Sequence, residues 1–152
     1  MNEIPSQRSV EFFKSGFFCA ESVLLAIAES QGIQSDLIPR IATGFCSGIS
    51  RTGGVCGAVS GAIMGINIIA GRDLPTESYE LSYSFVQKLI SRFEGQFGSV
   101  NCRQLIGCDL ASDGGQQYFM ENNLMERCLL YAGGATSIAV SLIDEVRNSR
   151  TT

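Results

Sequence analysis

The side chains with the greatest capacity for chemistry in this sequence are six cysteines, because the 152 residues include no histidine. The absence of histidine excludes Ser-His and Cys-His catalysis, mixed Cys/His zinc sites and histidine-ligated haem. No two cysteines form a C-x-x-C pair, so the spacings typical of zinc ribbons and ferredoxins are absent as well. The sequence therefore favours thiol redox chemistry or metal binding by thiolates.

Four of the cysteines fall at or near the start of a predicted helix: Cys19, Cys56, Cys102 and Cys128. The amino end of a helix carries unpaired N–H groups and a partial positive charge, and both favour a thiolate over a thiol. We therefore predict lowered pKa values for these thiols and expect their sulfurs to lie near one another at one end of the fold. The other two, Cys46 and Cys108, are predicted to be auxiliary thiols or core residues.

The stretch between Arg51 and Arg72 contains no charged residue and is rich in glycine. Its glycines at 53, 57, 61 and 65 recur at every fourth position, which places them on one face if the stretch is helical. Interior glycines cost a helix about 0.5–1 kcal/mol each, so close approach of a ligand or of a neighbouring helix must offset them. We predict close packing around the Cys56 site by four of the glycines: Gly53, Gly54, Gly57 and Gly61.

The length and the hydrophobic periodicity predict one domain over residues 1–152. We expect an all-α fold of five to seven helices around a buried glycine-rich helix at 54–70. Further helices are predicted at 6–14, 17–31, from about 76 to 97, from 102 and at 123–146, the last interrupted at Gly133-Gly134. Asn101, with Gln104 three residues later, is the predicted cap of the helix that begins at 102. Segments 46–54 and 109–117 are predicted loops. An aromatic and aliphatic stripe predicts the buried face of the helix ending at 97: Tyr79, Tyr83, Val86, Ile90, Phe93 and Phe97.

The composition limits the partners. The chain has 11 basic and 15 acidic residues and no basic cluster, so no nucleic-acid interaction is expected. Charged residues make up only 17%, which leaves room for a homodimer interface. The first 13 residues lack the apolar run of a secretory signal, so we expect a cytoplasmic location. The apolar segment 53–71 is diluted by glycine and polar residues, which favours a buried helix over a membrane span.

These features resemble the C_GCAxxG_C_C family of redox-active proteins. The central motif is similar to residues 56–61, CGAVSG, although Val55 precedes the cysteine and Gly57 follows it. Matching contexts surround three further cysteines, in FCAESVL at Cys19, FGSVNCRQL at Cys102 and the late Cys128. The resemblance covers roughly residues 10–145. It implies that these four cysteines are the functional set, that Cys46 and Cys108 are additional, and that an iron–sulfur site is a candidate cofactor.

Three functions stay open at this point. The first is an electron-transfer module in which four thiolates hold an iron–sulfur cluster, or alternatively zinc. The second is a metal-free thiol/disulfide relay or oxidoreductase in which two cysteines cycle between dithiol and disulfide. The third is a structural or interaction protein whose cysteines only pack. The sequence does not decide whether the protein is an enzyme, and it names no redox partner.

Overall fold

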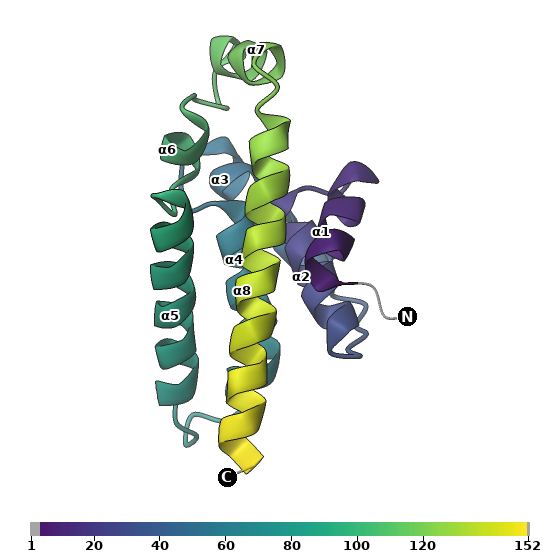
Figure 1. Ribbon diagram of the computed structural model, residues 1–152, viewed down its shortest axis with the longest axis vertical. Helices are drawn as coiled ribbons and strands as arrows, with labels where there is room; N and C mark the ends of the chain where they lie inside the picture. The colour runs from purple at the N-terminus through teal and green to yellow at the C-terminus, as the bar shows by residue number, and fades with distance from the viewer. Residues whose placement is uncertain (1–3, 152) are drawn as a thin grey trace.

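The computed structural model describes residues 4–151, and within that range the fold consists of eight α-helices and one 3-10 turn (Figure 1). The helices in chain order are α1 (Pro5–Lys14), α2 (Cys19–Ser30), α3 (Cys46–Arg51), α4 (Gly57–Ala70), α5 (Glu80–Phe97), α6 (Cys102–Ile106), α7 (Asp113–Glu121) and α8 (Met125–Thr151), with the 3-10 turn η1 (Arg40–Phe45) before α3. The predicted all-α class is confirmed. The predicted number of helices is too low, because α3 and α7 form where loops were expected.

Helix α4 is the buried central helix, and its glycines face α2. A Cβ on Gly61 would lie 2.6 Å from the carbonyl oxygen of Ala20, and one on Gly65 would lie 2.6 Å from Ile27 Cδ1. The glycine repeat therefore lets a neighbouring helix approach, which was one of the two predicted reasons for it. Gly53 does not belong to this face, because α4 begins at Gly57 and not at Gly54 as predicted.

Helix α8 is continuous and runs along the core in front of α4 (Figure 1). The predicted interruption at Gly133-Gly134 is wrong. A Cβ on Gly134 would lie 2.6 Å from the Phe97 ring, so this glycine makes room for α5 without breaking the helix. Helix α8 is long and apolar enough to cross a membrane, but a core helix meets the same test. Its fully buried residues include Ala135, Leu142 and Ile143.

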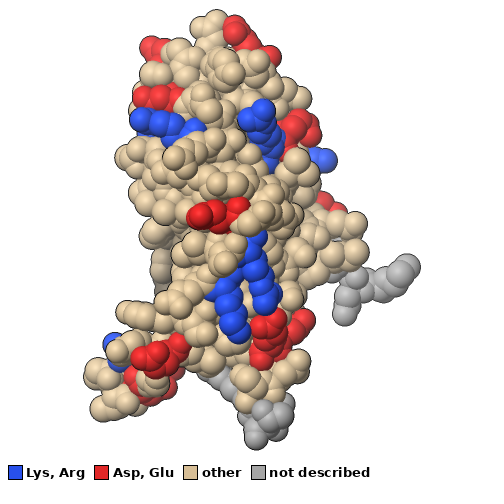
Figure 2. All heavy atoms as spheres, turned by 60° about the vertical axis from the view of Figure 1, so that its left-hand side comes forward, with Lys and Arg blue, Asp and Glu red and all other residues tan. Residues whose placement is uncertain are grey.

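Helix α5 packs on the core through part of the predicted stripe, since Phe93 is buried and both Ile90 and Phe97 pack against the core. Its buried residues are Phe85, Leu89 and Phe93, whereas Tyr79 and Tyr83 are 46% and 59% exposed. Tyr79 immediately precedes α5 and Tyr83 lies in its first turn, and the two rings lie 4.8 Å apart. The surface that includes α5 carries basic and acidic side chains interspersed with one another (Figure 2).

We predict opposite effects for alanine substitutions at two helical glycines. Gly61→Ala should lower the free energy of unfolding by about 1–3 kcal/mol, because its methyl group would meet the backbone of α2. Gly95→Ala should raise it by about 0.5–1 kcal/mol, since no atom lies within 4 Å of the added Cβ and alanine favours the helix. Urea unfolding of both variants measures the difference. Equal effects would show that Gly61 is not a contact point.

Candidate functional site

One cavity of about 320 Å³ lies where several helices begin, and four cysteines line it. They are the four singled out by the sequence: Cys19, Cys56, Cys102 and Cys128. Each comes from a different element, at position one of α2, just before α4, at position one of α6 and in the first turn of α8. The remaining wall is mainly apolar: Phe13, Phe18, Leu105, Ile106, Leu110, Phe119, Met120 and Met125. The expected convergence on one region is therefore observed.

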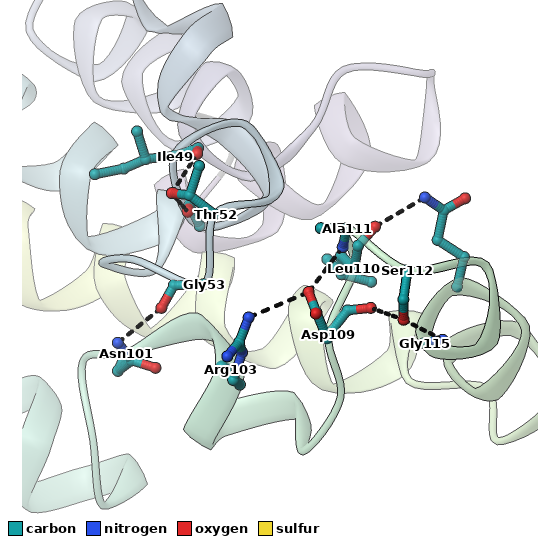
Figure 3. Close-up of polar contacts among 12 residues, drawn as sticks. Ile49, Thr52, Gly53, Asn101, Arg103, Asp109, Leu110, Ala111, Ser112 and Gly115 are labelled. Carbon is teal, nitrogen blue, oxygen red and sulfur yellow. Dashed lines mark hydrogen bonds and ion pairs between the residues drawn. The ribbon is translucent and has the colours of Figure 1, made fainter.

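A short antiparallel bridge between Val55 and Asn101 fixes two of these cysteines side by side. The N–H of Cys56 donates to the carbonyl of Val100 at 2.7 Å, and the N–H of Cys102 donates to Gly54 at 2.8 Å. The Asn101 amide also donates to the Gly53 carbonyl at 2.8 Å (Figure 3). The Asn101 side chain accepts the N–H of Gln104, so the predicted helix cap before Cys102 is present.

Cys19 lies against the start of α4. A Cβ on Gly57 would lie only 2.2 Å from the Cys19 sulfur, so a larger residue at this point would displace the Cys19 side chain. Gly57 also lines the cavity, unlike Gly61. Of the four glycines predicted to pack around the site, Gly57 is the one that directly makes room for a cysteine. Gly53 faces the Arg103 side chain and Gly54 faces Ile49.

Helix α3 contains a left-handed turn that the sequence analysis missed. Residues 47–51 all have φ between 54° and 68°, and four of the five are not glycine. Each non-glycine residue costs roughly 1–2 kcal/mol in this conformation. The Thr52 hydroxyl, which donates to the Ile49 carbonyl at 2.7 Å, helps to hold the turn (Figure 3). A Cβ on Gly48 would lie 2.5 Å from the Cβ of Cys102, so the turn packs tightly against the site.

The polar part of the cavity wall also escaped the sequence analysis. It consists of Ser47, Arg51, Gln116 and Tyr131. Arg51 is the only charged side chain among the described residues that line the cavity. The Tyr131 hydroxyl already donates to the Leu105 carbonyl at 3.0 Å. Only the run of glycines around residues 44–54 signalled an unusual backbone here, and it did not identify these side chains.

The predicted lowering of the thiol pKa values is wrong for three of the four cysteines. Burial raises the pKa of Cys56 to about 11, although the N–H groups of Ala58 and Val59 act in the opposite direction. Burial also raises the pKa of Cys128 to about 12, with neighbouring thiols adding to the effect. Burial raises the pKa of Cys102 too. Loss of hydration in the apolar cavity thus exceeds the effect of the helix ends.

The two additional cysteines lie outside the cavity wall. Cys46 is buried beside Cys19, and a hydrogen bond with the Cys19 thiol, followed by burial, raises its pKa. Cys108 is half-buried in the loop after α6. Within the described residues, no three Cys, Asp or Glu side chains form a group that could hold a metal ion. The four cavity thiols are thus arranged around a space and not around one point.

Comparison with known proteins identifies the family of the chain. Residues 17–142 match the family described as "Putative redox-active protein (C_GCAxxG_C_C)". The chain belongs to the C_GCAxxG_C_C family. An "Uncharacterized protein" of Archaeoglobus fulgidus is 30% identical over 112 residues, covering 68% of this chain and 74% of the relative. No solved structure matches the chain significantly. The C_GCAxxG_C_C match includes all six cysteines and supports a redox role in general terms.

We predict that the buried thiols make stability fall at alkaline pH in reduced, metal-free protein. Above the ordinary thiol pKa of 9.0, unfolded Cys56 loses its proton while folded Cys56 keeps it up to about 11. The unfolded state then binds fewer protons, so the free energy of unfolding decreases as the pH rises from 9 to 11. Urea unfolding at several pH values measures this slope, and Cys56→Ser should reduce it. A slope that is the same in Cys56→Ser would contradict the burial argument.

Proposed function

We propose that this protein transfers electrons by means of an iron–sulfur cluster held by Cys19, Cys56, Cys102 and Cys128. The observation that carries the proposal is that four thiols from four elements line a single, mainly apolar cavity of about 320 Å³. Four cysteines are the usual ligand set of such clusters. The general redox role of the family is consistent with this function.

We favour a cluster over zinc because the four cysteines line a cavity. A structural zinc ion needs four ligands in a tetrahedron around one point, at about 2.3 Å for sulfur. Within the described residues, no such group exists. A cluster has several metal atoms, each bound by its own thiolate, so its ligands are spread around a larger volume. The absence of carboxylates from the described cavity wall also leaves sulfur as the dominant donor.

The high thiol pKa values affect how a metal would bind to the cavity cysteines. Without a bound metal, Cys56 and Cys128 are protonated at neutral pH, so metal binding must displace their protons. Protonated thiols are also poor nucleophiles, which disfavours thiol–disulfide exchange by these two residues. The same apolar wall that raises their pKa values would exclude water from a bound cluster.

The chain also supplies hydrogen bonds to the sulfurs. The N–H of Ser47 donates to the Cys19 sulfur at 3.4 Å. The N–H groups of Ala58 and Val59 approach the Cys56 sulfur. When bound, an iron–sulfur cluster supplies a one-electron redox centre, and hydrogen bonds to its sulfurs influence the reduction potential. The left-handed turn and the first turn of α4 would therefore influence the potential of this site.

Reconstitution with iron and sulfide under anaerobic conditions tests the proposal. We expect the wild-type protein to become coloured and to retain iron and sulfide after desalting. Cys56→Ser should lose most of the bound iron, because it removes a thiolate from the cavity. Cys108→Ser, which changes a thiol outside the cavity wall, should bind as the wild type does. Metal analysis and visible absorption are the measurements.

Circular dichroism of each variant controls for unfolding. A folded wild-type protein that retains no iron or sulfide would refute the cluster. Equal loss of iron in Cys56→Ser and Cys108→Ser, with both variants folded, would refute the assignment of the ligands.

A further inference from the structure

Cys46 forms a second thiol contact that the four-cysteine site does not explain. This residue is the first of α3 and its side chain is 5% exposed. Cys19 packs against the small buried cluster to which Cys46 belongs. The next residue, Ser47, donates its N–H to the Cys19 sulfur at 3.4 Å. The start of α3 therefore lies directly beside the Cys19 sulfur of α2.

We propose that Cys19 and Cys46 are a redox pair that forms a reversible disulfide on reaction with a small-molecule disulfide. This inference goes beyond the proposed function, because the bond requires no cluster and uses a cysteine outside the cavity. The Cys19 sulfur lies 3.4 Å from the backbone nitrogen of Ser47, the residue next to Cys46. Rotation of the two cysteine side chains, without a rearrangement of the helices, would bring the sulfurs to the disulfide length of about 2.05 Å.

The surroundings give the two thiols different roles. Cys19 lines the cavity and is half-buried, so an incoming disulfide can reach it. Cys46 is buried behind it. The Cys46 thiol lies 3.6 Å from the Glu21 carboxylate, which can accept its proton. Cys19 is accordingly the residue that first forms a mixed disulfide with the small molecule. Cys46 is the residue that then attacks this mixed disulfide.

Glu21 is held in place from two other directions. Its carboxylate accepts the N–H of Phe18 at 3.0 Å and the hydroxyl of Thr43 at 2.9 Å. These hydrogen bonds connect the start of α2 with η1, immediately before Cys46. The carboxylate is thus fixed beside the buried thiol and does not extend into solvent.

The reaction balances in two exchange steps. The Cys19 thiolate attacks one sulfur of the small disulfide, forms a mixed disulfide and releases one thiolate. Cys46 then gives its proton to Glu21 and attacks the Cys19 sulfur, which breaks the mixed disulfide and releases the second thiolate. The protein loses two electrons and two protons overall, and the small disulfide becomes two thiols.

The disulfide would also change the cavity. The sulfur of Cys19 cannot bind a metal while it is bonded to Cys46, so oxidation removes one of the four cavity thiols. This consequence rests on the proposed function, whereas the bond itself does not. Oxidation of Cys19 and Cys46 would therefore control whether the cavity can bind the proposed cluster.

Peptide mapping tests the bond directly, because trypsin places every cysteine of this chain on a separate peptide. Reduced, metal-free, full-length protein is treated with oxidised glutathione, blocked with an alkylating reagent, digested and analysed by mass spectrometry. We expect peptides 15–40 and 41–51 to be joined, and a dithiol reductant to separate them. The same linkage should form in Cys108→Ser, the matched control with one cysteine removed elsewhere.

The variants Cys46→Ser and Cys46→Ala should leave Cys19 as a stable mixed disulfide with glutathione. Glu21→Gln, which keeps an acceptor for the Phe18 N–H, should slow formation of the internal disulfide roughly tenfold or more. Linkage of Cys19 to any other cysteine, or oxidation of Cys19 with Cys46 left free in wild-type protein, would overturn the proposal. The wild-type result does not depend on whether any variant folds or on whether iron binds.

Discussion

The backbone contact between α2 and α4 is the constraint on which the site depends. Gly61 allows the Ala20 carbonyl to approach to a distance that no side chain would permit, and Gly57 does the same for the Cys19 sulfur. The two helices therefore begin side by side, with Cys19 and Cys56 directed to the same cavity. The glycines that weaken α4 as an isolated helix are required for this placement. Packing and chemistry thus depend on the same residues.

Burial, more than position on a helix, determines the state of the cavity thiols. Cys56 has two N–H groups near its sulfur, the arrangement that lowers the pKa of many reactive cysteines. In this protein the apolar wall removes more hydration than those groups can replace, so the pKa rises. A positively charged metal centre would reverse the balance by stabilising the thiolates. In the metal-free protein, the Cys56 thiol is consequently poorly suited to nucleophilic attack.

The features that depend only on neighbouring residues in the chain could be predicted from the sequence. The cap at Asn101, the helix start at Cys102 and the glycine repeat of α4 each follow from short-range rules, and all are present. The left-handed turn could not be predicted, because non-glycine residues such as Ile49 adopt it only when surrounding contacts compensate for the strain. The pKa directions of the thiols likewise depend on burial, which arises from the whole fold.

The left-handed turn also bears on the proposed role of Cys46. In this turn the N–H of Ser47 donates to the Cys19 sulfur while Gly48 packs against Cys102. The turn therefore links two cavity cysteines through adjacent residues, directly after Cys46. Because Cys19 can bond to only one partner at a time, the proposed cluster and the proposed disulfide would exclude each other. The strained backbone of α3 would bring both proposed alternatives to the same sulfur.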